Sequence, residues 1–276
     1  MPSLEDVKSG WSQFHWRGRG EGWSRLWGAS VYQWWGTLYP RLHEFFPARS
    51  VLEIGVGYGR WTRYLLHGCD RLIGVDVVDK CVDSCRERFA AFPHATFHQN
   101  DGTSLEMVPD ESVDLAFSFD SLVHVDRPVL EAYLRALAVK LVPDGVGFLH
   151  HSNLGAYVDP VTRELTVPNP NVRDPTVSAA VLAELCGEMG LACIGQELVN
   201  WEVEHLNDCF SLITRPGSRF ERPNTVVENP RFMDEAAALA AVSAHYGPAS
   251  FPRVGKERAP EVEPGTPSRR LGEPHV

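Results

Sequence analysis

The chain has 276 residues, 43% of them hydrophobic and 22% charged, which suits one α/β domain with additions. Its net charge of −10, without a basic cluster, disfavours a nucleic-acid partner, because binding DNA or RNA needs a basic face that neutralises phosphates. No apolar run approaches the roughly 20 residues of a membrane helix, no secretion signal precedes the first strand, and no Cys-x-x-Cys pair occurs, so we expect a reduced, cytoplasmic protein.

The N-terminal 35 residues are rich in tryptophan, with six of the eight in the chain. Residues 23–46 predict one or two amphipathic helices. Most of these rings should pack on a sheet, while one or two can cover a ligand site, with the glycines of residues 18–22 as a hinge. We therefore assign residues 1–47 to an aromatic helical lid, and take Trp27, Tyr32 and Gln33 as candidate substrate-binding residues.

The stretch Val51-Leu-Glu-Ile-Gly-Val-Gly-Tyr-Gly59 predicts a buried strand, a glycine-rich turn and then a helix to about His67. Because glycine has no Cβ, the backbone at Gly55, Gly57 and Gly59 can turn tightly and come close to a ligand. The start of the following helix offers free N–H groups. These features predict a nucleotide-like cofactor at the carboxyl end of the first strand of a doubly wound sheet.

Strands and helices then alternate, as in a doubly wound sheet. Six more strands are predicted, at residues 71–76, 95–99, 112–119, 146–151, 191–200 and 209–214. Further helices are predicted at residues 79–91, 127–141, from Thr176 or Ser178 to Gly190, and 229–246. A proline-rich loop at 153–176 leaves the edge where substrates bind in such sheets. We expect residues 48–251 to form the main domain and residues 252–276 a disordered tail.

Acidic residues end two of these strands at positions suited to a nucleotide. Asp76 ends the second strand, where a carboxylate can accept hydrogen bonds from both ribose hydroxyls. Asp101 follows the third strand in the run Asn100-Asp-Gly102, where it can accept a bond from an adenine amino group. Both residues therefore become candidates for cofactor binding.

The spacing Glu53-x-Gly-x-Gly-x-Gly59 differs from the G-x-G-x-x-G of dinucleotide sites. With Gly74-Val-Asp76, Asn100-Asp-Gly102, Phe117-Ser-Phe-Asp-Ser-Leu-x-His-Val125 and Leu141-Val-Pro-Asp-Gly145, it resembles the class I S-adenosylmethionine (SAM) methyltransferases over residues 48–152. The chain departs once, with Pro-Asp-Gly-Val where that family often has Pro-Gly-Gly.

The resemblance implies a Rossmann-like, seven-stranded sheet with an antiparallel last strand, SAM as cofactor and S-adenosylhomocysteine as product. It assigns cofactor contacts to Glu53, Gly55, Gly57, Gly59, Asp76, Asn100, Asp101, Gly102, Phe119 and Asp120.

The flanking segments resemble a bacterial branch of these enzymes found with glycan and sugar-containing antibiotic pathways. They are the runs from Trp27 to Arg41, from His150 to Tyr157, and from Asn200 to Cys209. This likeness implies a small sugar or amino-sugar acceptor, and it adds Asn153 and Tyr157 to the candidate substrate-binding residues.

Methyl transfer to an alcohol requires removal of a proton near the transition state, whereas an amine must only be neutral. The candidate catalytic residues lie at the carboxyl edges of the fourth and fifth strands: His124, Asp120, His150 and His151. Strand alternation turns His150 and His151 to opposite faces, so the one facing the cleft is the candidate base. Asp120 can instead bind an acceptor or a divalent ion, although no spacing demands a metal and none is expected.

The leading hypothesis is therefore methylation of a hydroxyl on a sugar-containing small molecule of antibiotic biosynthesis. N-methylation of an aminoglycoside-like cation is the alternative, favoured by the negative net charge. Polysaccharide methylation, a nicotinamide-dependent enzyme and a non-catalytic cofactor-binding protein remain further alternatives, and the oligomeric state is left open.

Overall fold

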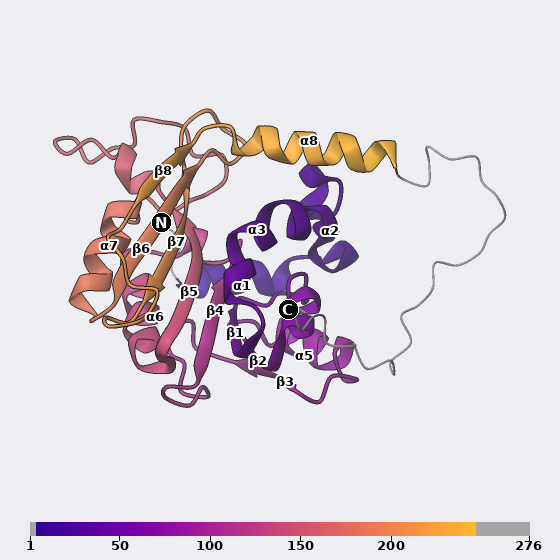
Figure 1. The fold of residues 1–276 in the computed structure, drawn as a ribbon. Helices are drawn as coiled ribbons and strands as arrows, with labels where there is room; N and C mark the ends of the chain where they lie inside the picture. The colour runs from indigo at the N-terminus through magenta and orange to yellow at the C-terminus, as the bar shows by residue number, and fades with distance from the viewer. Residues whose placement is uncertain (1–3, 247–276) are drawn as a thin grey trace, which may run out of the picture.

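A computed structural model describes residues 4–246 of the protein (Figure 1). At its centre lies one eight-stranded sheet in the order β3-β2-β1-β4-β5-β7-β6-β8. The strands are β1 (Ala48–Ile54), β2 (Cys69–Asp76), β3 (Ala95–Gln99), β4 (Val113–Ser118), β5 (Leu141–Ser152), β6 (Ala192–Val199), β7 (Asp208–Thr214) and β8 (Val226–Asn229). The predicted disordered tail, residues 252–276, lies outside the described residues.

The sheet confirms the predicted doubly wound architecture. Neighbouring strands run parallel, except that β7 is antiparallel to both β5 and β6. The eighth strand, β8, is an addition to the seven predicted, and it pairs in parallel with β6 at the sheet edge. Its four residues are largely exposed, so they lack the buried apolar pattern by which strands are recognised.

Helices cover both faces of the sheet (Figure 1). The longer ones are α1 (Leu4–Gln13), α5 (Asp79–Arg88), α6 (Arg127–Lys140), α7 (Ala179–Glu188) and α8 (Phe232–His245). Along the chain, α1 and β1 are separated by η1 (Arg17–Trp27), α2 (Ser30–Gln33), η2 (Trp34–Leu38), α3 (Tyr39–Leu42) and η3 (His43–Phe45). The remaining short helices are α4 (Thr62–Leu65), η4 (Leu66–Gly68), η5 (Leu122–His124) and η6 (Leu154–Tyr157). No helix within residues 4–246 is long and apolar enough to cross a membrane.

Two apolar layers hold the helices on the sheet. Phe117 of β4 and Phe148 of β5 belong to a cluster that also contains Trp27, residues of α5 and the start of α8. The alternate residues Ala116 and Leu149 pack on the other face with α6 and α7. The α8 helix runs along the N-terminal helices, where it packs on η1, α2 and η2 (Figure 1).

Two predicted helices begin later than expected. The helix predicted from Gly59 starts only at Thr62, because the three loop glycines adopt left-handed backbone angles that no α-helix contains. The helix predicted from Asn229 starts at Phe232, because the preceding residues are taken up by β8.

Candidate active site

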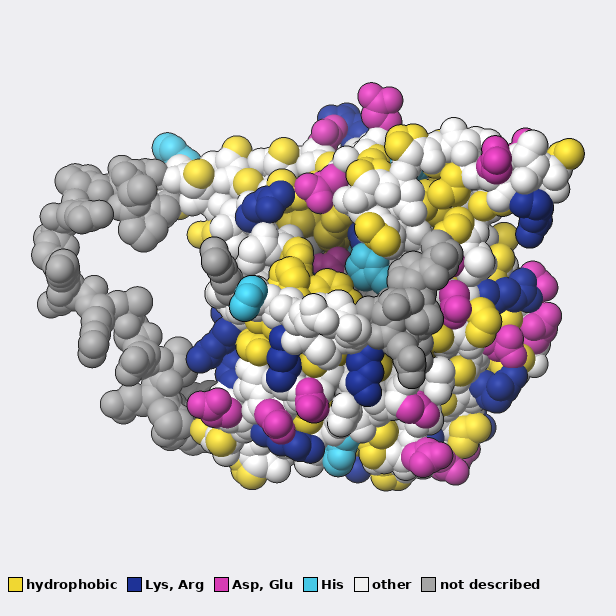
Figure 2. Space-filling view, turned by 180° about the vertical axis from the view of Figure 1, so that it is seen from behind, with side chains coloured by type: hydrophobic (Ala, Val, Ile, Leu, Met, Phe, Trp, Pro, Cys, Tyr) yellow, Lys and Arg dark blue, Asp and Glu magenta, His cyan; other side chains and the backbone are white. Residues whose placement is uncertain are grey.

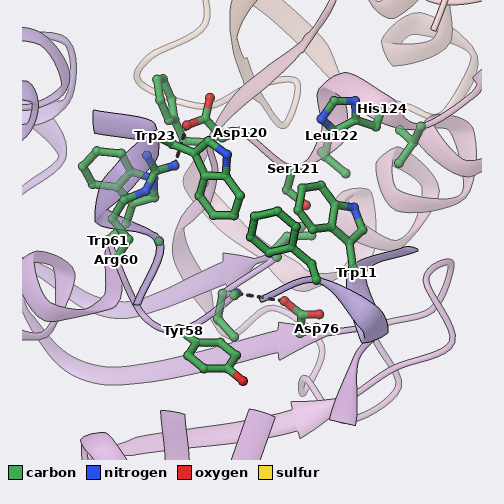
Figure 3. A pocket seen from close by; sticks show the side chains of 18 of the residues that line it. Trp11, Trp23, Tyr58, Arg60, Trp61, Asp76, Asp120, Ser121, Leu122 and His124 are labelled. Atoms are coloured by element: carbon green, nitrogen blue, oxygen red, sulfur yellow. Dashed lines mark hydrogen bonds and ion pairs between the residues drawn. The ribbon is translucent and has the colours of Figure 1, made fainter. Parts of the chain in front are cut away.

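A cavity of about 690 Å³ lies at the carboxyl ends of β1, β2 and β4, beneath the N-terminal segment. This volume is within the range of about 300–1,000 Å³ typical of small-molecule sites. Its aromatic wall consists of Trp11, Phe14, Trp16, Trp23, Tyr58, Trp61, Phe119, Tyr133 and Trp201. Figure 2 shows a hollow in one face of the molecule, where hydrophobic side chains surround charged ones, and Figure 3 shows the cavity from close by.

The glycine loop forms the floor of the cavity on the side of β1. Gly55, Gly57 and Gly59 have φ angles of 79°, 52° and 76°, a region that other residues rarely adopt. A Cβ on Gly55 would lie 2.1 Å from Oγ of Ser121, so a side chain there is also excluded by contact. The amide of Gly57 donates to Oδ2 of Asp76 at 2.8 Å, which fixes the loop against the end of β2.

Asp76 and Glu53 are the two carboxyl groups beside this loop. Asp76 lines the cavity and also accepts a bond from the amide of Val78, at 2.9 Å, and burial raises its pKa. Glu53 is 1% exposed. Its Oε2 accepts a bond from the hydroxyl of Thr62, but its Oε1 has no partner among the described residues. Burial raises the pKa of Glu53 to about 8.

These features fit SAM. Gly55 and Gly57 present backbone without a side chain to the cavity, and Asp76 offers a carboxylate with unused lone pairs. Glu53 and Gly59 do not line the cavity, and the unpartnered Oε1 of Glu53 is a buried polar atom still to be satisfied. Among residues 4–246, no group of three or more His, Cys, Asp or Glu side chains is arranged to hold a metal ion.

The run after β3 only partly reaches the cavity. Gly102 lines it, whereas Asn100 and Asp101 do not. Oδ1 of Asp101 accepts bonds from the amides of Thr103 and Ser104, at 2.8 and 2.7 Å, and its side chain is exposed. Asp101, which the sequence predicts to accept a bond from adenine, therefore holds a local turn, because a short acidic side chain readily bonds the neighbouring backbone. Asn100 is buried behind the cavity wall.

A connected set of five ionisable side chains crosses the ends of β4, β5 and β7: Arg60, Asp120, His150, Asp208 and Arg173. Arg60 donates to Oδ2 of Asp120, and Oδ1 of Asp120 lies 3.4 Å from Nδ1 of His150. Nε2 of His150 lies 2.9 Å from Oδ2 of Asp208. Asp208 also accepts two bonds from Arg173, from Nε at 2.8 Å and from Nη2 at 2.7 Å. With neutral His150 the two arginines and two carboxylates balance. We call these five residues the ion network.

The ion network keeps Asp120 ionised at the cavity. Burial acts to raise the pKa of Asp120 and of Asp208, but the neighbouring arginines and His150 outweigh it and lower both pKa values. Burial acts to lower the pKa of His150, but its two carboxylate partners outweigh burial and raise it. Asp120 also has a left-handed φ of 60°, and its amide donates to Nδ1 of His150 at 3.2 Å. Strained residues of this kind gather at functional sites.

His124 lines the cavity beside Trp11 (Figure 3). Its Nδ1 lies 2.9 Å from the carbonyl oxygen of Val172. Since a carbonyl only accepts, Nδ1 carries the proton and Nε2 carries the lone pair, with no partner in the described part of the chain. Burial, and then the positive charge of Arg173, lowers the pKa of His124. The neutral ring can therefore accept a proton.

The other two predicted histidines do not reach the cavity. His150 and His151 point to opposite faces, as alternation requires, but both are fully buried. His150 lies behind Asp120, while His151 contacts Ser211 at 2.8 Å, and burial lowers its pKa to about 4. His151 as the base is therefore corrected to a packed residue. His150 lies behind the cavity wall, where it contacts Asp120 and the rings of Phe119 and Trp201, at 4.6 and 5.2 Å.

The predicted substrate-binding residues are also corrected, because none of the five lines the cavity: Trp27, Tyr32, Gln33, Asn153 and Tyr157. Trp27 is fully buried in the core and donates to Thr37 at 2.9 Å. Asn153 and Tyr157 instead bind the backbone of Leu206. Tyr32 is exposed and Gln33 is buried in the N-terminal helices. Four of the rings that do line the cavity come from the same N-terminal segment as Trp27, where composition does not tell which ring faces inward: Trp11, Phe14, Trp16 and Trp23.

Sequence reasoning missed three members of the ion network. Arg60 directly follows the last loop glycine, and its guanidinium lies over the rings of Trp61 and Trp23, at 4.4 and 5.5 Å. Asp208 is part of the flanking pattern quoted above, and a carboxylate directly before an apolar strand is a signal for a buried partner. Arg173 sits in the proline-rich loop with no local signal.

Comparison with known proteins agrees with this geometry. Residues 51–145 match the family model described as a methyltransferase domain. Phosphoethanolamine N-methyltransferase 1 of Triticum aestivum is 29% identical over 109 residues, 39% of this chain and 22% of that protein. Ribosomal RNA small subunit methyltransferase A of Dehalococcoides mccartyi is 29% identical over 102 residues, 36% of this chain and 34% of that protein. The chain thus spans about a third or less of the length of these curated relatives.

A solved structure shares the fold. The putative methyltransferase bound to the Haloferax volcanii Trm112 methyltransferase activator has a TM-score of 0.54 and 17% identity, covering 79% of this chain and 99% of that one. At 17% identity this likeness concerns the fold alone. The predicted Rossmann-like α/β fold is confirmed, and residues 51–145 are similar to a methyltransferase domain.

Proposed function

We propose that this chain is a SAM-dependent enzyme that methylates a hydroxyl of a sugar-containing small molecule in antibiotic or related natural-product biosynthesis. The observation that carries the proposal is His124, whose unpartnered Nε2 lies at the cavity as a proton acceptor. A hydroxyl acceptor needs such a base, whereas an amine does not. All six cysteines are free thiols, which supports action in the cytoplasm.

The side of the cavity at β1 and β2 is proposed to hold the cofactor. Bound SAM supplies an electrophilic methyl group on a sulfonium centre. Asp76 accepts the ribose hydroxyls, and the bare backbone of Gly55 and Gly57 lies against the cofactor. Of the other predicted cofactor contacts, Gly102, Phe119 and Asp120 line the same cavity, whereas Glu53, Gly59, Asn100 and Asp101 do not.

The acceptor is proposed to bind between the cofactor and the ends of β4 and η5. Figure 3 shows Asp120 and His124 on that side of the cavity, opposite Asp76. The ionised Asp120 accepts a bond from one acceptor hydroxyl, and Nε2 of His124 takes the proton of the hydroxyl that is methylated. The rings of Trp11 and Trp23 offer flat apolar surfaces to the sugar ring.

N-methylation of an amino sugar is the second candidate. A carboxylate in an aromatic cavity also suits an ammonium group, and Asp120 is placed for it. In that reaction the acceptor needs only to lose its ammonium proton before transfer, so the turnover would depend less on His124.

The test combines binding and turnover. We expect micromolar binding of S-adenosylhomocysteine by titration calorimetry and none of NAD. A screen of sugar and aminoglycoside acceptors, with and without EDTA, then identifies the acceptor class. For a hydroxyl acceptor, His124→Gln should lower kcat by about 100-fold while cofactor affinity persists, because general-base removal costs on that order.

His67→Gln is the matched control, because His67 is an exposed histidine that does not line the cavity. Full turnover by His124→Gln with a hydroxyl acceptor would contradict the base assignment. Binding of NAD instead of S-adenosylhomocysteine would overturn the cofactor.

A further inference from the structure

Strained backbone is concentrated around the cavity. Six non-glycine residues of the described chain have left-handed φ angles, and four of them line the cavity: Arg19, Asp120, Val172 and Glu202. Val172, at 52°, is the least favourable of these, because its β-branched side chain crowds the backbone in this region. Such a conformation persists only where the surrounding structure imposes it.

The left-handed conformation of Val172 positions its backbone carbonyl and does not bury its side chain. Val172 is 60% exposed, so burial of the residue does not account for the strain. The carbonyl of Val172 is the group that accepts the bond from Nδ1 of His124, at 2.9 Å. The strained residue therefore determines which ring nitrogen of His124 holds the proton.

The next residue, Arg173, anchors this position to the sheet. Its guanidinium makes two parallel bonds to Asp208, of 2.8 and 2.7 Å, and Asp208 is fully buried at the start of β7. Such a two-bond fork fixes orientation as well as distance. The backbone amide and carbonyl of Arg173 are both bonded by the side chain of Asn169, at 2.8 Å each. Arg173 is thus held at both its backbone and its side chain.

We propose that Arg173 is a positioning residue: its fork on Asp208 holds the carbonyl of Val172 against Nδ1 of His124 and so keeps Nε2 free as the base. This inference rests on the proposed function. The proline-rich loop thereby orients the base His124, while Arg173 itself takes no proton.

The charges around His124 provide a second readout. Arg173 acts to lower the pKa of His124, whereas Asp208 and Asp120 act to raise it. Arg173→Lys keeps the charge and loses the fork. Arg173→Met loses both, and it should raise the pKa of His124, because one positive neighbour is removed and Asp208 is left uncompensated.

The experiment uses the full chain and three variants: Arg173→Lys, Arg173→Met and the control Arg41→Lys. Arg41 makes an equivalent fork on Glu197, with two bonds of 2.6 Å, and does not line the cavity. The nitrogen-15 NMR signals of the His124 ring, identified by their loss in His124→Gln, report tautomer and titration without any acceptor. The pH profile of kcat and calorimetry with S-adenosylhomocysteine complete the set.

We expect the unchanged chain to hold the proton on Nδ1 of His124. Arg173→Lys should mix the two tautomers and lower kcat by about tenfold, because a misplaced base loses alignment with the acceptor, while its affinity for S-adenosylhomocysteine stays unchanged. The control Arg41→Lys should keep the tautomer and the kcat of the unchanged chain. Arg173→Met should in addition move the acid limb of kcat to higher pH. If Arg173→Met does not fold, Arg173→Lys decides the question.

Retention of the Nδ1 tautomer and of full kcat in Arg173→Lys would overturn the positioning proposal and leave the proposed function standing. Full turnover by His124→Gln would instead overturn the base assignment, whatever the result for Arg173. Equal losses of kcat in Arg41→Lys and Arg173→Lys would show that Arg173 only stabilises the fold, and would overturn the positioning proposal.

Discussion

The two sides of the cavity are built in different ways. On the proposed cofactor side, the loop of Gly55 to Gly59 bonds Asp76 over a separation of 19 residues, and a backbone amide makes this contact. On the proposed acceptor side, charged side chains from five separate segments form the ion network, with separations of 58 residues between His150 and Asp208 and 60 between Arg60 and Asp120. The first side is therefore specified locally, while the second exists only once the sheet has formed.

This contrast predicts different consequences of mutation. A buried charge in the ion network cannot be removed without leaving another uncompensated, so damage there should appear as lost stability. A change on the cofactor side leaves the core intact and should appear as lost affinity or altered pH dependence. Three experiments test this distinction.

The largest effect is expected for Asp208→Ala. It leaves Arg173 without its carboxylate and His150 without one partner, both within the protein interior. The free energy of unfolding should fall by about 3–5 kcal/mol, measured by urea denaturation at pH 7. The control Glu106→Ala changes an exposed carboxylate and should stay within about 0.5 kcal/mol. A loss below about 1 kcal/mol for Asp208→Ala would show that the ion network does not stabilise the fold.

An intermediate effect is expected for Glu53→Gln, as a change in pH dependence. Burial raises the pKa of Glu53 from 4.5 to about 8, so between these values the folded chain keeps a proton that the unfolded chain releases. The free energy of unfolding should therefore fall as pH rises through this window, and Glu53→Gln should remove that fall, gaining on the order of a few kcal/mol at pH 8.

Asp208 should behave in the opposite sense. Its pKa is lowered from 3.8, so its stabilising contribution is present above that value and is lost as pH falls through the lower folded pKa. Urea denaturation of the unchanged chain and of Glu53→Gln from pH 5 to pH 8 measures the effect of Glu53. Identical slopes with and without Glu53 would contradict its buried, protonated state.

The smallest effect is expected for Asp76→Ala, which should weaken S-adenosylhomocysteine binding by about 1–3 kcal/mol because a charged hydrogen-bond acceptor is lost. Calorimetry of Asp101→Ala provides the comparison, since that carboxylate faces a local turn and does not line the cavity. Unchanged affinity in Asp76→Ala would remove the ribose assignment. An equal loss in Asp101→Ala would restore the adenine contact that the sequence predicts.

The sequence by itself determined the frame of this protein and the glycine loop on the proposed cofactor side of its cavity. Alternating apolar runs specify the strands. Three glycines specify the turn after β1, and the strand that follows them ends in Asp76. Each of these signals acts over a few neighbouring residues. The predicted sheet and its antiparallel β7 are confirmed, and only the short exposed β8 lacked a pattern.

Only the tertiary structure decided the acceptor side. It turns Trp11, Trp16 and Trp23 toward the cavity and Trp27 into the core, although all four share one segment and one chemistry. It also joins Arg60 and Arg173 to carboxylates that lie at distant positions in the chain. Side-chain direction and the pairing of buried charges depend on which strands meet at one edge, a property of the assembled sheet that no local pattern contains.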